Sequence, residues 1–265
     1  MTISKIIHAA FAAIAGFSIA TALITGAAAQ ASSTQAVKNV VLVHGAWADG
    51  SSWDKVIPLL EAKGLRVVAV QLSLTSLQND VATVKRALAL QDGPTVLVGH
   101  SYAGAVISIA GNDDKVAGLV FVAAFAPDKG ESVFSISQPY PPAPIATELR
   151  PDSHGFLSVT PKGIKEDFGQ DVSEHEKELL VATQGPTNVS CFSTNLPVAA
   201  AWKTKPDWFV VASEDRVIPP DLERDEAAAM NATTITLDSS HVAMLSHPKA
   251  VADVIEEAAA KALQK

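Results

Sequence analysis

The stretch Thr95–Gly104 constrains the fold of this chain more than any other part of the sequence. It begins with the run TVLV, which is β-branched or apolar throughout and predicts a buried strand. Gly99, Ser101 and Ala103 follow at alternate positions, and Gly104 leads into a second apolar segment. Small residues at this spacing are typical of a sharp strand–turn–helix bend, which presents a serine hydroxyl above a parallel sheet. We therefore expect Ser101 to be a nucleophile at such a bend.

Strand-like and helix-like segments alternate along most of the chain. Short apolar, β-branched runs occupy residues 37–43, 67–70, 95–98, 116–124, 208–211 and 233–237. Between them, apolar residues recur every three or four positions in 53–60, 77–88 and 248–258. Strands that alternate with helices predict an α/β fold, with a mostly parallel sheet of about six strands and helices on both faces. In such sheets a ligand binds beyond the carboxyl ends of the strands.

Residues 128–206 depart from this alternation. They contain a proline-rich connector at 140–144, a helical stretch at 173–183 and scattered single aromatic residues: Phe134, Tyr140, Phe156, Phe168, Phe192 and Trp202. A long insertion between strands is either disordered or a functional cap, and the aromatic residues favour a helical cap. The residues expected to contact a substrate are Trp47, Phe134, Tyr140, Phe168 and Trp202.

A serine nucleophile needs a base to remove its proton, and the base works best when a carboxylate orients it. On a fold of this kind the acid and the histidine follow later strands, in the order serine, acid, histidine. Asp215 directly follows the predicted strand 208–211, and His241 follows the strand 233–237. The sequence therefore predicts a triad of Ser101, Asp215 and His241.

Other residues compete for these roles. Glu214 adjoins Asp215 and is an alternative acid, and Asp128 occupies another position where an acid can follow a strand. Asp238 is expected to be a turn residue and His100 a structural one. His44, at the end of the first strand, is expected to support the neighbouring loop.

Acyl transfer also requires hydrogen-bond donors for the developing oxyanion. One donor in this arrangement is the backbone N–H of the residue after the nucleophile, which is Tyr102. The second comes from the loop after the first strand, where Gly45 permits a tight course and the amide of Ala46 is the expected donor.

Composition excludes several classes of function. The net charge of −8 is opposite to what a nucleic-acid-binding surface needs. A single cysteine, Cys191, excludes an internal disulfide and any all-cysteine metal site, and this residue is expected to be a buried apolar one.

The N-terminal segment has the pattern of a secretory signal peptide. Lys5 precedes an apolar run, and small residues in A-x-A spacing lie near Ala29 and Ala31. We expect residues 1–31 to be removed on export to a bacterial periplasm or to the outside, leaving 32–265 as the hydrolase domain without stable membrane association. An uncleaved membrane anchor is the alternative.

Four motifs together resemble the α/β-hydrolase superfamily. They are VLVHGAW at 41–47, GHSYAG at 99–104, EDRVIP at 214–219 and HVAML at 241–245. More narrowly, the chain resembles the branch that holds plant methyl-ester esterases, hydroxynitrile lyases and bacterial homologues. The resemblance implies Ser101 as nucleophile, Asp215 as acid and His241 as base. It also implies oxyanion amides at Ala46 and Tyr102 and the absence of any metal or organic cofactor.

Three positions depart from the pattern of that branch. Ala103 stands where the bend usually has its last glycine. The lyases resembling this branch carry a lysine after the triad histidine and a threonine near the oxyanion loop, where this chain has Val242 and Gly45. Both differences count against cyanohydrin cleavage.

The sequence thus predicts a serine hydrolase that cleaves a small or medium carboxylic ester through an acyl-enzyme. Two alternatives stay open. The same pocket could run lyase or cofactor-free oxygenase chemistry, or the chain could be a non-catalytic ligand-binding protein. The sequence predicts no oligomeric state.

Overall fold

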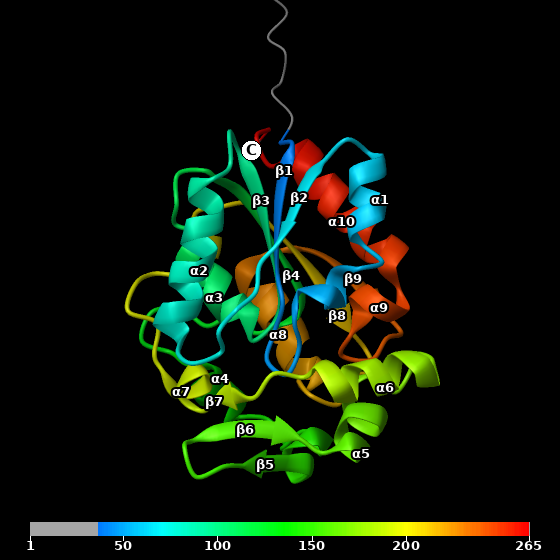
Figure 1. The fold of residues 1–265 in the computed structure, drawn as a ribbon. Coiled ribbons are helices and arrows are strands. Elements are labelled where there is room, and N and C mark those ends of the chain that lie inside the picture. Colours follow the sequence, from blue (N-terminus) through cyan, green and yellow to red (C-terminus); the bar gives the residue numbers. More distant parts are fainter. Residues whose placement is uncertain (1–36, 265) are drawn as a thin grey trace, which may run out of the picture. The chain divides into compact units, whose positions relative to one another are not determined.

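A computed structural model of this protein describes residues 37–264, and their centre is a six-stranded parallel sheet in the order β2-β1-β3-β4-β8-β9 (Figure 1). Its strands are β1 (Asn39–Val43), β2 (Arg66–Ala69), β3 (Thr95–Ser101), β4 (Val116–Ala124), β8 (Asp207–Ala212) and β9 (Thr233–Leu237). Adjacent strands pair in parallel throughout. The expected α/β fold with about six parallel strands is confirmed.

Helices cover both faces of this sheet. The helices outside the insertion are η1 (Gly50–Trp53), α1 (Ile57–Ala62), α2 (Leu77–Ala89), α3 (Ala103–Ala110), α8 (Pro220–Met230), α9 (Ala243–Ser246) and α10 (Pro248–Lys261). Helix α2 packs beside α3 and α1 packs beside α10, and Figure 1 shows these two pairs on opposite sides of the sheet.

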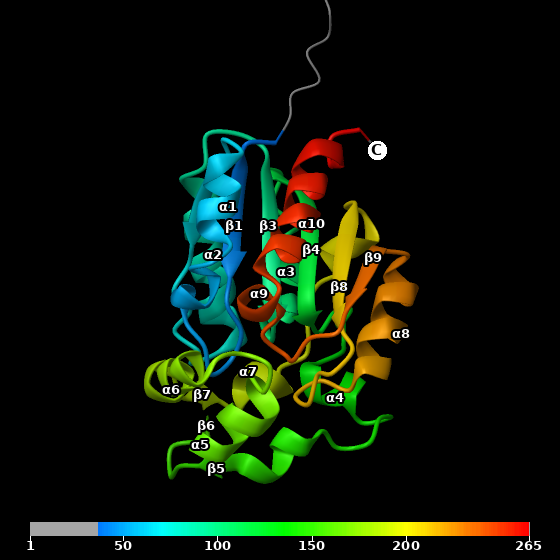
Figure 2. The same cartoon turned by 90° about the vertical axis from the view of Figure 1, so that its right-hand side faces the viewer.

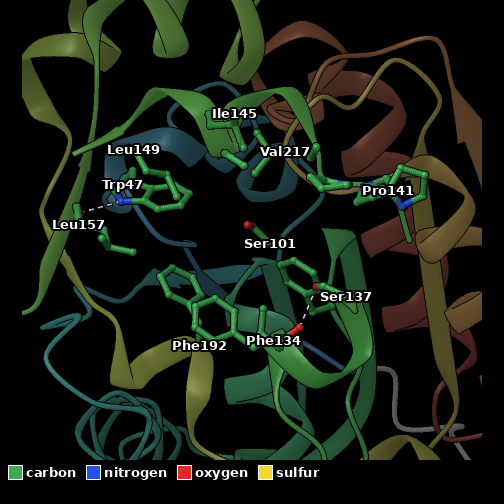
Figure 3. Close-up of a pocket in the computed structure, with 16 residues that line it drawn as sticks. Trp47, Ser101, Phe134, Ser137, Pro141, Ile145, Leu149, Leu157, Phe192 and Val217 are labelled. Carbon is green, nitrogen blue, oxygen red and sulfur yellow. Dashed lines mark hydrogen bonds between the residues drawn. The ribbon is translucent and has the colours of Figure 1, made fainter. Parts of the chain in front are cut away.

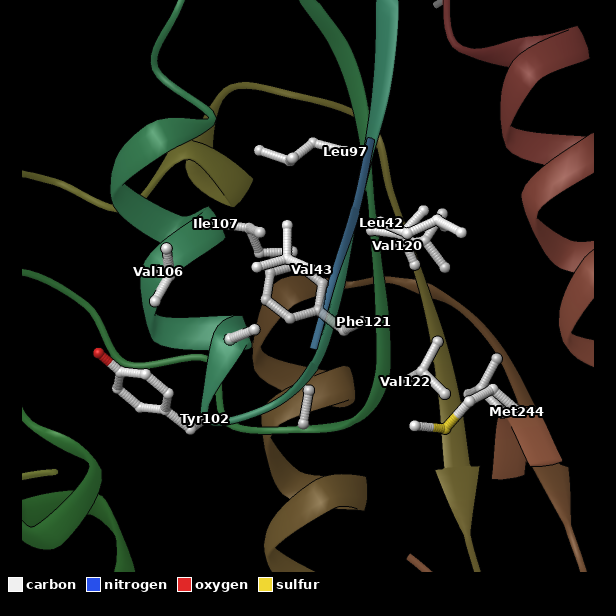
Figure 4. Close-up of a cluster of buried hydrophobic side chains, with 14 of the residues drawn as sticks. Leu42, Val43, Leu97, Tyr102, Val106, Ile107, Val120, Phe121, Val122 and Met244 are labelled. Carbon is white, nitrogen blue, oxygen red and sulfur yellow. The ribbon is translucent and has the colours of Figure 1, made fainter. Parts of the chain in front are cut away.

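The core lies in the centre of the sheet. Every residue of β1 and β3 is buried, whereas the edge strands β2 and β9 contain only half-buried and exposed residues. A parallel sheet covered on both faces makes its central strands apolar throughout, which is why these runs could be recognised in the sequence. Figure 4 shows Phe121 among the buried side chains, where its ring stacks on that of Phe209 at 5.8 Å.

Residues 125–206, between β4 and β8, lie over the carboxyl ends of the strands, as Figures 1 and 2 both show. Their elements are α4 (Val133–Ser137), η2 (Pro144–Glu148), β5 (Leu149–Pro151), β6 (Phe156–Val159), α5 (Pro161–Gly163), the π-helical η3 (Ile164–Phe168), α6 (Glu174–Thr183), β7 (Thr187–Asn188), α7 (Ser190–Ser193) and η4 (Ala201–Lys203). The sequence predicts a helical cap here, and the helix predicted at 173–183 is present as α6.

The insertion also holds a small sheet that the sequence did not predict. Strands β5, β6 and β7 pair antiparallel. They are two to four residues long, which is too short to establish a period of two.

The expected signal peptide, residues 1–31, lies outside the described residues and stays a prediction. Among residues 37–264, none of the helices combines the length and the apolar character that crossing a membrane requires.

Candidate active site

Ser101 lies at a strained bend between β3 and α3. Its φ of 57° falls in the left-handed region, which a residue with a side chain rarely adopts. Such strain persists only where the surrounding structure enforces it, and it is common at catalytic positions.

The close approach of helix and strand at this bend depends on Gly104. A Cβ on Gly104 would lie 1.9 Å from the carbonyl oxygen of Phe125. Ala103, by contrast, is a buried first residue of α3. The steric need for a glycine therefore falls one residue after the position where the usual motif has it, which explains how the chain tolerates Ala103.

His241 and Asp215 form a fully buried pair at the carboxyl ends of β8 and β9. The imidazole Nδ1 donates to the Asp215 Oδ2 at 2.6 Å, and neither side chain is exposed. The Asp215 Oδ1 accepts from the backbone N–H groups of Val217 and Ile218 at 2.6 and 2.9 Å. Within residues 37–264 the His241 Nε2 has no hydrogen-bond partner. The structure therefore shows no hydrogen bond between this nitrogen and the Ser101 hydroxyl, and Nε2 is free to accept a proton.

The alternative acids Asp128 and Asp238 bond to other groups and not to His241. Asp128 pairs with Lys203 at 2.8 Å and accepts from the backbone N–H of Ala200. Asp238 accepts from the hydroxyl of Ser213 at 2.9 Å, as a turn residue would. Of the acids considered from the sequence, Asp215 is the one whose carboxylate contacts His241.

Two further histidines support the site as neutral rings. The His44 Nε2 accepts from the backbone N–H of Leu72 at 2.9 Å, and its Nδ1 donates to the Gly45 carbonyl at 2.8 Å. The His100 Nε2 donates to the backbone carbonyl of His241 at 2.9 Å. Burial lowers the pKa of His44, and it lowers the pKa of His100 well below its usual value. These bonds hold the loop after β1 and the backbone of the triad histidine, so both residues have the supporting roles expected of them.

The loop after β1 passes directly over Ser101. A Cβ on Gly45 would lie 2.6 Å from the Cβ of Ser101, so only a glycine permits this approach. Trp47 follows with φ of 55°; its indole Nε1 donates to the Leu157 carbonyl at 2.8 Å, and its backbone N–H donates to Thr187 Oγ1. The loop is thus bound to the cap and lies against Ser101 at Gly45.

Ser101 lines a cavity of about 220 Å³ that lies under the cap (Figure 3). The other lining residues are mostly apolar: Trp47, Phe125, Val133, Phe134, Ser137, Pro141, Pro142, Ala143, Ile145, Ala146, Leu149, Leu157, Phe192, Val217 and Pro219. No charged side chain is among them. Phe192 stacks on Phe134 at 5.8 Å and packs against Trp47 at 5.5 Å, which makes one aromatic wall.

The five residues predicted to contact substrate lie in three different places. Trp47 and Phe134 line the cavity with Ser101. Tyr140 and Trp202 instead line a separate cavity beside α8, where the Tyr140 hydroxyl donates to Asp225 at 2.7 Å. Phe168 is buried and packs edge-on against the His241 ring at 5.1 Å. Composition shows that the insertion carries aromatic residues, but not which way each one points.

Sequence analysis did not place Phe192, Phe125 or the aliphatic residues of the insertion in this cavity. Phe192 was one of the scattered aromatic residues, so it carried a partial signal. Ile145, Leu149 and Leu157 carried none, because a single aliphatic residue is equally compatible with core and cavity.

Cys191 and the ring of Tyr102 belong to a buried cluster around Asp80. The Tyr102 hydroxyl donates to the Asp80 carboxylate at 3.0 Å, and the Cys191 thiol lies 3.8 Å from the same oxygen. Burial raises the pKa of Cys191 to about 12, so the thiol stays protonated. The cysteine is the inert buried residue that its context predicted, and the cluster anchors the residue after the nucleophile.

A largely buried carboxyl group on α8 makes the stability of the folded chain depend on pH. Glu226 accepts from the backbone N–H of Ala126, and burial raises its pKa to about 8. The unfolded chain releases this proton near the ordinary pKa of 4.5, so between pH 4.5 and 8 the folded chain binds more protons and its stability falls as pH rises.

Replacing Glu226 by Gln is therefore expected to remove part of the stability loss that occurs as pH rises. The two pKa values correspond to a loss of about 4 kcal/mol between pH 5 and pH 9. Over this range the melting temperature of the wild type should therefore fall by about 8–15 °C more than that of Glu226→Gln. Differential scanning calorimetry at both pH values measures the difference. Parallel curves for the two proteins would contradict an elevated pKa at this position.

Within residues 37–264 no three or more His, Cys, Asp or Glu side chains are grouped so as to hold a metal ion.

Comparisons with known proteins identify similar chains. The alpha/beta hydrolase family matches residues 40–254. The chain is 28% identical to a pyrethroid hydrolase of Sphingobium wenxiniae, over 83% of this chain and 87% of that one. It is 29% identical to methylesterase 1 of Arabidopsis thaliana, over 82% and 94%. Among solved structures, that of a pyrethroid hydrolase from Sphingobium faniae JZ-2 superposes with a TM-score of 0.74 at 26% identity, covering 84% of this chain and 97% of that one.

Proposed function

This chain belongs to the alpha/beta hydrolase family, and we propose that it is a serine carboxylesterase that acts through a Ser101–His241–Asp215 triad. The observation that carries the proposal is the buried His241–Asp215 pair, whose outer nitrogen is left without a partner. It occurs on the same sheet edge as a serine held in a strained bend at the base of an apolar cavity. Relatives named as a methylesterase and a pyrethroid hydrolase support hydrolysis.

In the proposed mechanism the Ser101 hydroxyl attacks the ester carbonyl carbon while the His241 Nε2 takes its proton. Asp215 holds the imidazole in the tautomer that leaves Nε2 free, and it stabilises the positive charge that forms. The backbone N–H groups of Ala46 and Tyr102 stabilise the oxyanion. The intermediate collapses, the C–O bond to the alcohol breaks, and His241 gives its proton to the departing alcohol.

Water then repeats these steps on the acyl-enzyme. His241 takes a proton from water as its oxygen attacks the acyl carbon. The bond to Ser101 breaks, and the serine recovers its proton from His241. The products are one carboxylic acid and one alcohol.

The cavity suggests an uncharged, compact, apolar substrate. Its lining carries no charged side chain, and a carboxylate buried without a partner costs several kcal/mol. Its volume of about 220 Å³ fits a small or medium group on either side of the ester.

The test compares p-nitrophenyl butyrate with the singly charged p-nitrophenyl hemisuccinate, two substrates of similar length and the same leaving group. Because of the desolvation cost, we expect kcat/KM to be about 100-fold lower for the anionic ester. Equal values would show that the acyl group does not enter this cavity. Hydrolysis of neither ester would contradict the esterase proposal.

A further inference from the structure

Glu223 of α8 is a fully buried carboxyl group behind the His241–Asp215 pair. None of its surface is exposed, and its Oε2 accepts from the backbone N–H of Ala212 at 3.0 Å, at the end of β8. Within residues 37–264 its Oε1 accepts no hydrogen bond. A buried carboxyl oxygen without a hydrogen bond destabilises the fold. A protonated Glu223 avoids this cost, because its O–H can donate a hydrogen bond.

The charged neighbours of Glu223 disfavour its ionisation. Burial raises the pKa of Glu223 well above its usual value, and the negative charge of Asp215 and a hydrogen bond to it raise it further. Glu226, one turn along α8, acts in the same direction. The cation on this network is His241 when it is protonated, and it faces Asp215 rather than Glu223.

The hydrogen bonds of Asp215 leave room for one more donor. An ionised carboxylate offers about four lone-pair sites. Three are used, by the Nδ1–H of His241 and the backbone N–H groups of Val217 and Ile218. A proton on Glu223 would supply the fourth bond and satisfy its own Oε1 at the same time.

We propose that Glu223 is a neutral positioning residue whose protonated carboxyl donates a hydrogen bond to Asp215 and so fixes the carboxylate that orients His241. The inference rests on the proposed function, since it concerns the acid of that triad. Glu223 moves no proton during the reaction. It keeps the Asp215 carboxylate from turning, and it does so without adding a second negative charge beside the base.

This role predicts different behaviour for two replacements of similar size. Glu223→Gln keeps an acceptor for Ala212 and a donor for Asp215, and it carries no charge. Glu223→Met has about the same volume but removes both. Glu226→Gln, on the same helix and outside the triad, is the matched control.

We expect Glu223→Gln to keep kcat/KM within about threefold of the wild type, with the acid limb of its pH profile at the same position. Glu223→Met should lose about 10- to 100-fold, the equivalent of one hydrogen bond to a charged group. The loss should be mainly in kcat, and the acid limb should move to higher pH because the charge on Asp215 is less neutralised. Glu226→Gln should leave both parameters unchanged.

Two results would overturn the proposal. If Glu223 were ionised, Glu223→Gln would remove a negative charge near the base and move the acid limb to lower pH. If Glu223 only filled space, Met and Gln would give the same pH profile. Should Glu223→Met fail to fold, the pH profile of Glu223→Gln still distinguishes a neutral from an ionised group.

An infrared measurement tests the proton itself without any turnover. At pH 7 Glu223 and Glu226 should each contribute the carbonyl band of a protonated carboxylic acid, because burial raises the pKa of both. The wild-type minus Glu223→Gln difference spectrum should therefore contain a carbonyl component at a different position from the one that Glu226→Gln removes. Absence of that component would overturn the proposal. If the Glu223 component were present in a protein with no esterase activity, the proposed function would be wrong, and Glu223 would still be shown to be protonated.

Discussion

Replacing Ser101 by Ala is expected to lower kcat for p-nitrophenyl butyrate by about 10⁴-fold or more, because no other group can form the acyl-enzyme. Alanine keeps the Cβ and the strained φ of 57° and removes only the hydroxyl. The fold should therefore be unaffected, with the melting temperature unchanged. Steady-state kinetics and labelling with a fluorophosphonate measure the effect, and mass spectrometry of the labelled peptide should locate the modification on Ser101.

Ser137 provides the matched control for this experiment. It is the other serine of the cavity lining, and its hydroxyl donates to the Val133 carbonyl at 2.7 Å, away from any base. Ser137→Ala should keep near wild-type activity and labelling. Labelling of Ser137, or more than a tenth of the activity in Ser101→Ala, would show that the nucleophile has been misassigned.

The second large effect is expected for Asp215→Asn, at about 10⁴-fold in kcat. The Asp215 Oδ1 accepts from the N–H groups of Val217 and Ile218, so the asparagine oxygen will stay there and its NH₂ group will face His241. Because that NH₂ donates, the imidazole must turn its Nδ1 into an acceptor and carry its proton on Nε2. A protonated Nε2 cannot accept the serine proton, so the base is lost although the packing is preserved.

Glu214→Gln is the matched control, since it neutralises the adjacent acid that also follows β8. It should keep kcat within about twofold, because a change of charge at a surface position away from the base has little effect. Asp128→Asn should behave in the same way, although it loses the pairing with Lys203. If Glu214→Gln or Asp128→Asn abolished activity while Asp215→Asn did not, the acid would have to be reassigned.

Much of the fold could be predicted because the local sequence pattern identifies the central strands. The run at 116–124 is β4 as the structure has it. Central strands covered on both faces must be apolar along their whole length, so their composition alone distinguishes them from loops. The insertion was harder, since its strands of two to four residues carry no usable period.

The candidate site shows the same division. A nucleophile bend has strict local requirements, and so Ser101 could be singled out, but the close contact that demands a glycine is between Gly104 and Phe125, which is visible only in the fold. Likewise, nothing in the sequence distinguished Glu223 from the exposed acids Asp221 and Asp225 on the same helix. Its burial depends on β8 and Asp215, which the fold brings beside it.

The sequence by itself determined the order of strands and helices, the bend at Ser101 and the short set of acids and histidines that follow later strands. These depend on periodicity and on neighbours within a few positions, which the linear chain records directly. Only the tertiary structure decided which carboxylate contacts His241, which aromatic side chains face the cavity, and that a second acid lies behind Asp215. The physical reason is that such contacts join residues far apart in the chain, and side-chain direction and burial are set by the packing of whole elements against one another.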